Sequence, residues 1–368
     1  MPVDSFFPVG AATSLSPSEI ERELSSMWKP INEAEGASVS RVVLGNVLWI
    51  GRESQAERIR SVFQSVAPKY PARVFLIILR EGDNPEITAT VAAQCFRPKA
   101  GDIPVCCEMI TLYFTGKSGR HVRGCVAPLL LADIQTVLLT TLDPEEFPQI
   151  KDLQQHVDRT ISMASLAADP AAVLRGCFES EQSCFDLSWF RMIPIRQQVS
   201  AFFDDAAQSF RLDKISEVRV SAVRRSSGST LPELMSALFV GWIAARMKWT
   251  VAESAGGDFQ YASAAGPVTV RLEQCEAGVD CGAATLTGIT LRDRDGSSFD
   301  VSLAGQRMNM VASKGESHLA ERHLFLSELD EADALGTALN TPMTVRYFRQ
   351  AATLAAPLLE KFLTMESK

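Results

Sequence analysis

Three consecutive stretches decide the fold of the first half of this chain: NVLWI (46–50), ESQAERIRSVFQSV (53–66) and VFLIIL (74–79). The first and third are short apolar runs of the length typical of buried strands, whereas the middle one repeats its apolar residues at helical spacing. The pattern therefore predicts a strand, a helix and a second strand, which is the repeating unit of a layered α/β domain.

The flanking sequence extends this unit on both sides. Residues 88–95 and 108–114 alternate like the strands of a hairpin joined by the loop 98–104, and a helix (120–132), a strand (136–140), a helix (147–159) and a strand (160–165) follow. Upstream, Ser16, Pro17 and Glu19 have the spacing of a helix N-cap, a first-turn proline and a capping box, which predicts a helix over 17–28. We expect an α/β N-terminal domain with a mixed sheet over residues 1–168.

The pattern changes after Ala168. Residues 170–203 are mostly helical, with an interruption near Pro194, and a strand (218–223) and a helix (232–247) come next. Strands at 268–272, 286–291, 299–303 and 322–326 precede two helices at 330–339 and 343–362. This order predicts an α+β C-terminal domain over 169–368, since 368 residues exceed one ordinary core.

Composition limits the possible partners. The formal net charge is −8, and the longest cationic run is the Arg224-Arg225 pair, so nucleic acid is not expected as a partner. The apolar runs 127–132 and 238–245 are far shorter than a membrane span, and the N-terminus lacks the pattern of a secretory signal. A cytoplasmic protein without a membrane partner is predicted.

Motifs for catalysis are missing from the sequence. Neither glycine-rich phosphate-binding motif occurs, and Gly51 next to Arg52 and Glu53 is typical of an ordinary turn. Ser26 and Lys29 match the spacing of acyl-serine enzymes without the companion motifs. Only four histidines occur, and His318 and His323, five residues apart, have no neighbouring cysteine, which leaves little for a metal site. We expect no enzyme, no metal and no cofactor.

Eight cysteines lack a regular framework, so in a reducing compartment most are expected as free thiols. Cys275 and Cys281 are the best-spaced pair for a redox-active disulfide, although the surrounding carboxylates favour ordinary thiols. Cys106 and Cys107 are adjacent on a predicted strand, where neighbours point to opposite faces. We expect one of them to be buried and the other exposed.

Four segments together resemble a known family. They are CCEMITL (106–112), LLAD (130–133), DLSWFRMIP (186–194) and LFVGWIAARMKW (238–249). They look like the glucose-6-phosphate dehydrogenase assembly proteins called OpcA, with Cys106, Cys107, Trp242 and Trp249 as signature residues. On their apolar helix, Trp242 and Trp249 are expected in the core.

The resemblance implies a non-catalytic protein that binds glucose-6-phosphate dehydrogenase and favours its active oligomer in the oxidative pentose phosphate pathway. Trp and Arg concentrate binding energy at interfaces, so Trp189, Arg191 and Arg196 are candidate partner-binding residues. Asp186 belongs to the same segment, either as a contact or as a helix N-cap.

The sequence departs from the family pattern at Gln135, Leu139, Met163 and Ile195, where the family has proline, tryptophan or an Asp-Ser-Ser stretch. Two alternative functions therefore stay open. One is a scaffold for another protein. The other is an enzyme that binds a sugar phosphate or nucleotide at the carboxyl ends of its parallel strands.

Overall fold

A computed structural model describes residues 7–9, 16, 19–34, 40–96, 105–143, 147–180, 182–205, 211–224, 229–252, 258–275, 285–326, 328–342 and 344–366. The chain divides into two compact units. The first lies within 1–162 with two short later segments, 182–184 and 335–341, and the second takes the remainder. Among the described helices, none is both long and apolar enough to cross a membrane.

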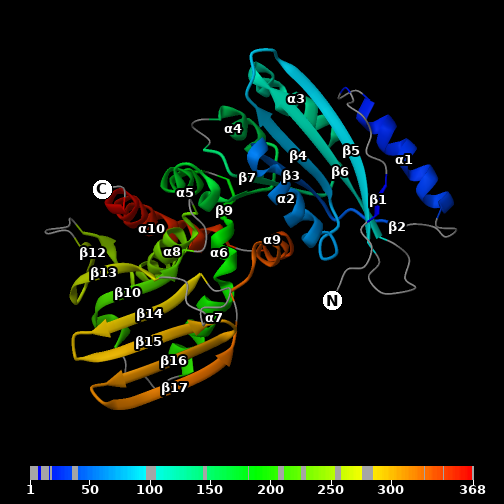
Figure 1. Cartoon of the computed structure of the whole chain (residues 1–368). Coiled ribbons are helices and arrows are strands. Elements are labelled where there is room, and N and C mark those ends of the chain that lie inside the picture. The colour runs from blue at the N-terminus through cyan, green and yellow to red at the C-terminus, as the bar shows by residue number, and fades with distance from the viewer. Residues whose placement is uncertain are drawn as a thin grey trace. The chain divides into compact units, whose positions relative to one another are not determined.

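A mixed sheet, which we call sheet A, organises the first unit (Figure 1). Its strand order is β1-β5-β6-β4-β3-β7-β8-β9, and β2 also pairs with β6. The strands are β1 (Phe7–Val9), β2 (Ser40–Arg41), β3 (Gly45–Arg52), β4 (Arg73–Arg80), β5 (Glu86–Phe96), β6 (Val105–Thr115), β7 (Gln135–Thr140), β8 (Arg159–Ser162) and β9 (Cys184–Asp186). Strands β6, β4, β3, β7 and β8 are parallel, whereas β5 runs antiparallel to both β1 and β6. The predicted mixed α/β arrangement is confirmed.

The helices of this part of the chain differ from prediction in one place. They are α1 (Ile20–Ala34), α2 (Glu53–Val66), α3 (Val122–Val126) and α4 (Pro148–Gln154). The single helix predicted over 120–132 is wrong, because α3 has only five residues and lies between two 3-10 turns, Gly116–His121 and Ala127–Leu129. Gly124 and Pro128 lie within that range, and each disfavours a continuous α-helix.

A second mixed sheet, sheet B, organises the second unit (Figure 1). Its order is β11-β12-β13-β10-β14-β15-β16-β17, with β10 parallel to β13 and the other pairs antiparallel. The strands are β10 (Ile215–Val223), β11 (Thr250–Val251), β12 (Phe259–Ser263), β13 (Gly266–Cys275), β14 (Leu286–Asp293), β15 (Ser297–Ala304), β16 (Arg307–Lys314) and β17 (Ser317–Phe325). Of these, β11, β12 and β16 were not among the predicted strands.

The C-terminal half of the chain contains further helices, some of which pack against sheet B. They are α5 (Pro170–Glu179), α6 (Leu187–Arg191), α7 (Ile193–Asp205), α8 (Leu231–Met247), α9 (Glu331–Asn340) and α10 (Val345–Glu366). Helix α8 contacts β10, β13 and β14, and the ring of Phe202 on α7 lies 4.8 Å from that of Phe299 on β15. The α+β character of this region agrees with prediction, although the helical stretch 170–203 is interrupted by strand β9 and at Met192 rather than at Pro194.

A buried ion pair joins two strands of sheet A. Arg73 on β4 faces Glu108 on β6, and its Nε donates to a Glu108 carboxylate oxygen at 2.7 Å. The Arg73 Nη1 also donates to Glu21 of α1 at 2.8 Å and to the Leu129 carbonyl at 2.7 Å. Because both Arg73 and Glu108 are buried, their charges are compensated almost entirely within the protein.

The cysteines of the β5–β6 hairpin correct two expectations. Cys95 and Cys106 face each other across the strands and form a disulfide. Cys106 and Cys107 are both buried, so the expected exposure of one is wrong. They do point to opposite faces, but both faces are covered there. Cys106 joins the core cluster that includes Leu24 of α1, whereas Cys107 packs in a second cluster with Ala67.

Reduction of the Cys95–Cys106 disulfide is expected to lower the free energy of unfolding by about 2 kcal/mol, because the bond closes a short loop in the unfolded chain. Urea unfolding with and without reductant measures this. The Cys95→Ala/Cys106→Ala variant is the control and should not respond to reductant. An equal response of the variant would assign the effect to other thiols.

Candidate functional site

The segment Asp186–Arg196 turns sharply from β9 into α6 and α7. Asp186 is the N-cap of α6, and one carboxylate oxygen accepts a hydrogen bond from Ser188 N at 2.8 Å. The other oxygen accepts from Ala164 N, also at 2.8 Å. The carboxylate is fully buried and therefore fixes the start of α6 rather than facing solvent.

Trp189 and Arg196 form a buried stack within this segment. The Arg196 guanidinium carbon lies 3.4 Å from the Trp189 ring centroid, and its Nη2 donates to the Trp189 carbonyl at 2.8 Å. Phe348 of α10 covers the ring edge-on, with centroids 5.6 Å apart. Burial lowers the pKa of Arg196 to about 9. The cation is thus held by an aromatic face and a carbonyl, not by a carboxylate.

Arg191 is held by a carboxylate from another part of the second unit. Its Nη2 donates to Glu328 at 2.7 Å, and the same carboxylate accepts from the backbone N and hydroxyl of Thr285, both at 2.8 Å. Glu328 is buried and Arg191 is mostly so. Of the four predicted contact residues, Asp186, Trp189 and Arg196 are therefore buried, and Arg191 keeps a small exposed fraction.

The two signature tryptophans of α8 and its C-terminal end have different environments. Trp249 is buried as predicted, and its ring lies 6.0 Å from that of Tyr261. Trp242 is only half-buried, so its predicted place in the core is wrong in part. One side of its ring meets Phe239, at 5.3 Å between centroids. The other signature residues, Cys106 and Cys107, are both internal.

Charged side chains pair with one another at the carboxyl ends of parallel strands β3 and β4 in sheet A. Glu53 in the first turn of α2 accepts from Arg80 Nη2 at 2.6 Å, and the Arg80 guanidinium lies 3.9 Å from the Tyr113 ring centroid. A phosphate at this helix start would meet a carboxylate. A side chain at Gly51 would also collide with the Trp49 ring. The geometry does not favour a nucleotide there.

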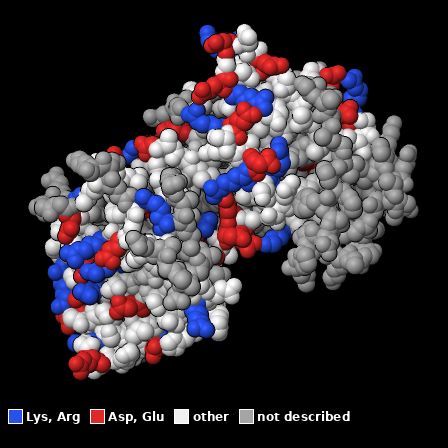
Figure 2. Space-filling view, viewed as in Figure 1, with Lys and Arg blue, Asp and Glu red and all other residues white. Residues whose placement is uncertain are grey.

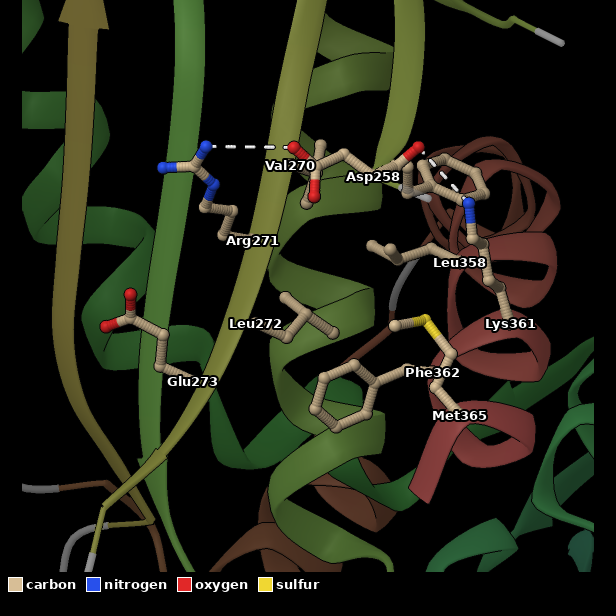
Figure 3. Close-up of a pocket in the computed structure, with 10 residues that line it drawn as sticks. Asp258, Val270, Arg271, Leu272, Glu273, Leu358, Lys361, Phe362 and Met365 are labelled. Atoms are coloured by element: carbon tan, nitrogen blue, oxygen red, sulfur yellow. Dashed lines mark hydrogen bonds and ion pairs between the residues drawn. The ribbon is translucent and has the colours of Figure 1, made fainter. Parts of the chain in front are cut away.

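A pocket of about 220 Å³ lies in the second unit (Figure 3). It is lined by the start of β12, by residues 270–273 of β13 and by the C-terminal part of α10. Leu272, Phe362 and Met365 point toward one another across it, whereas Arg271 and Glu273 leave β13 on the opposite side (Figure 3). Lys361 donates to the Asp258 carbonyl at 3.1 Å. The pocket offers apolar surface rather than convergent catalytic groups.

Two family models match the chain in order along its length. The model of the glucose-6-phosphate dehydrogenase subunit N-terminal domain matches residues 64–178, and that of the subunit's C-terminal domain matches 182–352. The chain belongs to the OpcA family. The resemblance seen in the sequence is therefore confirmed.

A curated OpcA relative and one solved structure were compared with the chain. The putative OxPP cycle protein OpcA of Synechocystis sp. is 22% identical over 254 residues, which are 65% of this chain and 49% of the relative. The chain spans about half the length of that relative. The transcriptional regulator Gal80p of Kluyveromyces lactis is similar at a TM-score of 0.44 and 10% identity, covering 92% of this chain and 96% of that one. That TM-score is too low to support an argument.

The departures from the OpcA pattern lie mainly inside the protein. Leu139, Met163 and Ile195 are all buried, and Gln135 begins strand β7. A change at a buried position alters packing and leaves the exposed side chains in place. The departures at Leu139, Met163 and Ile195 therefore change internal packing, whereas Gln135 is only half-buried.

The structure describes only part of the predicted redox pair, Cys275 and Cys281. Cys275 carries an exposed free thiol, whereas Cys281 lies outside the described residues, so their pairing stays a prediction. Burial raises the pKa of the Cys107 thiol to about 11, which makes it a poor nucleophile. No cluster of three metal-ligating side chains occurs within the described ranges.

Proposed function

We propose that this chain is a non-catalytic cytoplasmic assembly factor that binds glucose-6-phosphate dehydrogenase and favours its active oligomer in the oxidative pentose phosphate pathway. The observation that carries the proposal is the ordered match of both OpcA domains over residues 64–178 and 182–352. The printed name of the Synechocystis relative, an OxPP cycle protein, points to the same pathway.

The proposed mechanism is a shift of an oligomerisation equilibrium. A bound protein changes such an equilibrium only if it binds one state more tightly than the other. Chemistry on the chain itself is not required. The Arg80–Glu53 pair at the carboxyl edge of sheet A and the apolar pocket beside α10 both agree with a binding role. On the face in Figure 2, basic and acidic side chains of the described residues are interspersed, whereas a nucleic-acid surface gathers cations.

The Asp186–Arg196 segment supports this function in two ways. Arg191, which keeps a small exposed fraction, is proposed as the partner contact at its edge. Asp186, Trp189 and Arg196 are buried, and they contribute by holding the segment in shape through the N-cap and the ring stack. Loss of either support should weaken partner binding together with stability.

Mixing the chain with glucose-6-phosphate dehydrogenase from the same cell tests the function. We expect a complex whose mass, by light scattering after size exclusion, exceeds that of either protein, together with a higher specific activity of the dehydrogenase. An acidic bystander protein of similar pI is the control for non-specific effects. A mixture that elutes as two separate proteins with unchanged activity would contradict the proposal. Capture of a different protein from the lysate would then favour the scaffold alternative.

A further inference from the structure

The C-terminal end of α8 and the N-terminal end of α10 present a cluster of interface-type side chains that the functional segment does not include. We call Trp242, Arg246 and Tyr347 the α8–α10 patch. The two helices are antiparallel neighbours, because Gly241 lies against Ala351 whereas Arg246 lies over the Tyr347 ring, 5.9 Å from its centroid.

Gly241 brings these helix ends together. A Cβ at this position would lie 2.3 Å from the Ala351 carbonyl oxygen, so only glycine permits the observed approach of the α10 backbone. Trp242 and Arg246 are four residues apart and therefore share one face of α8. Close helix packing thus places a Trp, an Arg and a Tyr next to one another on one surface.

The patch is open to solvent although its side chains are of kinds that proteins usually cover. Tyr347 is 54% exposed, Arg246 is exposed and Trp242 is half-buried. Trp, Tyr and Arg are the residues most enriched among those that dominate the energy of protein interfaces. The half-covered Trp242 ring, backed by Phe239, is rigid and loses little entropy when a partner covers it.

The cations around the patch have no ion-pair partner among the described residues. Arg246, Lys248 and Arg346 are exposed and form no ion pair with any residue in the described part of the chain. Elsewhere in the second unit exposed arginines do pair, such as Arg175 with Glu360 at 2.8 Å and Arg211 with Asp213 at 2.8 Å. In a chain of net charge −8, three uncompensated cations at one helix junction favour a negatively charged partner surface.

We propose that the α8–α10 patch docks a carboxylate-bearing surface of glucose-6-phosphate dehydrogenase. Trp242 and Tyr347 supply the apolar contact, and the Arg246 guanidinium forms a bidentate ion pair with an Asp or Glu side chain of the partner. This assignment rests on the proposed function and adds to it the contact surface and the chemistry of the partner's matching surface.

Charge reversal at Arg246 tests the patch. The Arg246→Glu variant should bind the dehydrogenase about 30-fold more weakly than the unmodified chain, because a central arginine is replaced by a repelling charge. Its melting temperature should be unchanged, since Arg246 is exposed. The matched control is Arg307→Glu on β16, which makes the same charge change at another exposed arginine and should bind within about twofold of the unmodified chain.

Two further measurements separate contact from general charge effects. Tyr347→Ala should also weaken binding, and affinity of the unmodified chain should fall as salt rises, with a smaller slope for Arg246→Glu. Binding by isothermal titration calorimetry reports all of these. If the unmodified chain binds while Arg246→Glu and Tyr347→Ala bind equally well, the patch assignment is wrong and the function stands. If the unmodified chain does not bind, the proposed function itself fails.

Discussion

Arg73→Met is expected to lower the free energy of unfolding by about 3–5 kcal/mol, the largest effect of any single charge removal in sheet A. The substitution leaves the fully buried Glu108 carboxylate without the guanidinium that lies 2.7 Å away. A charge that water cannot reach loses its compensation, while methionine fills most of the vacated volume. Urea unfolding followed by far-UV circular dichroism measures the change.

The double variant Arg73→Met/Glu108→Leu separates charge from packing. It should recover most of the lost stability, because apolar pairs replace buried ion pairs at little cost. The exposed Arg60–Glu57 pair on α2 gives the control, and Arg60→Met should cost less than about 1 kcal/mol. A single variant as stable as the unmodified chain would mean that the Arg73–Glu108 pair does not hold the strands.

Trp189→Ala should cost about 3–5 kcal/mol of unfolding free energy, since it removes a large, fully buried side chain. The cavity would open between Phe348 and Arg196, so the Arg196 cation would lose its aromatic face as well. Chemical denaturation gives the magnitude, and affinity for the dehydrogenase should fall in the same variant.

Trp189→Phe and Trp242→Ala are the comparisons. Phenylalanine retains an aromatic face for Arg196 and should be clearly milder. Trp242 is half-buried, so its removal should affect partner binding more than stability. Should Trp189→Ala unfold within about 1 kcal/mol of the unmodified chain, the stack would not be what orders the segment.

The strands and helices that depend on local pattern were predictable from the sequence. NVLWI and VFLIIL became β3 and β4 because unbroken apolar runs suit strands covered on both faces. The prediction of one helix over 120–132 was wrong. The apolar residues there repeat as in a helix, but Gly124 and Pro128 interrupt the helix. Strand β16 was missed although Met308, Met310 and Ala312 are apolar residues at alternate positions, because Val311 between them interrupts the apolar/polar pattern.

The candidate site was predictable by residue but not by environment. The segment DLSWFRMIP pointed to the OpcA family. Asp186 is a helix N-cap, one of the two roles predicted for it from the sequence. Trp189 is covered by Phe348, and the Arg191 guanidinium is paired with Glu328. Both partners lie far along the chain from this segment. The cysteine disulfide required the register of β5 against β6, which no local pattern specifies. Exposure of Trp242 likewise follows from tertiary packing alone.

The position of β10 in sheet B has a consequence for how the chain acquires its structure. Val218 pairs with Val270 on one side and with Leu291 on the other, so both neighbours of β10 are synthesised well after it. A strand whose partners are distant in sequence forms late, because closing long loops costs entropy before any contact is gained. We expect the second unit to be the slower one to fold, with one edge of β10 unpaired on the ribosome until β14, which ends at Asp293, has emerged.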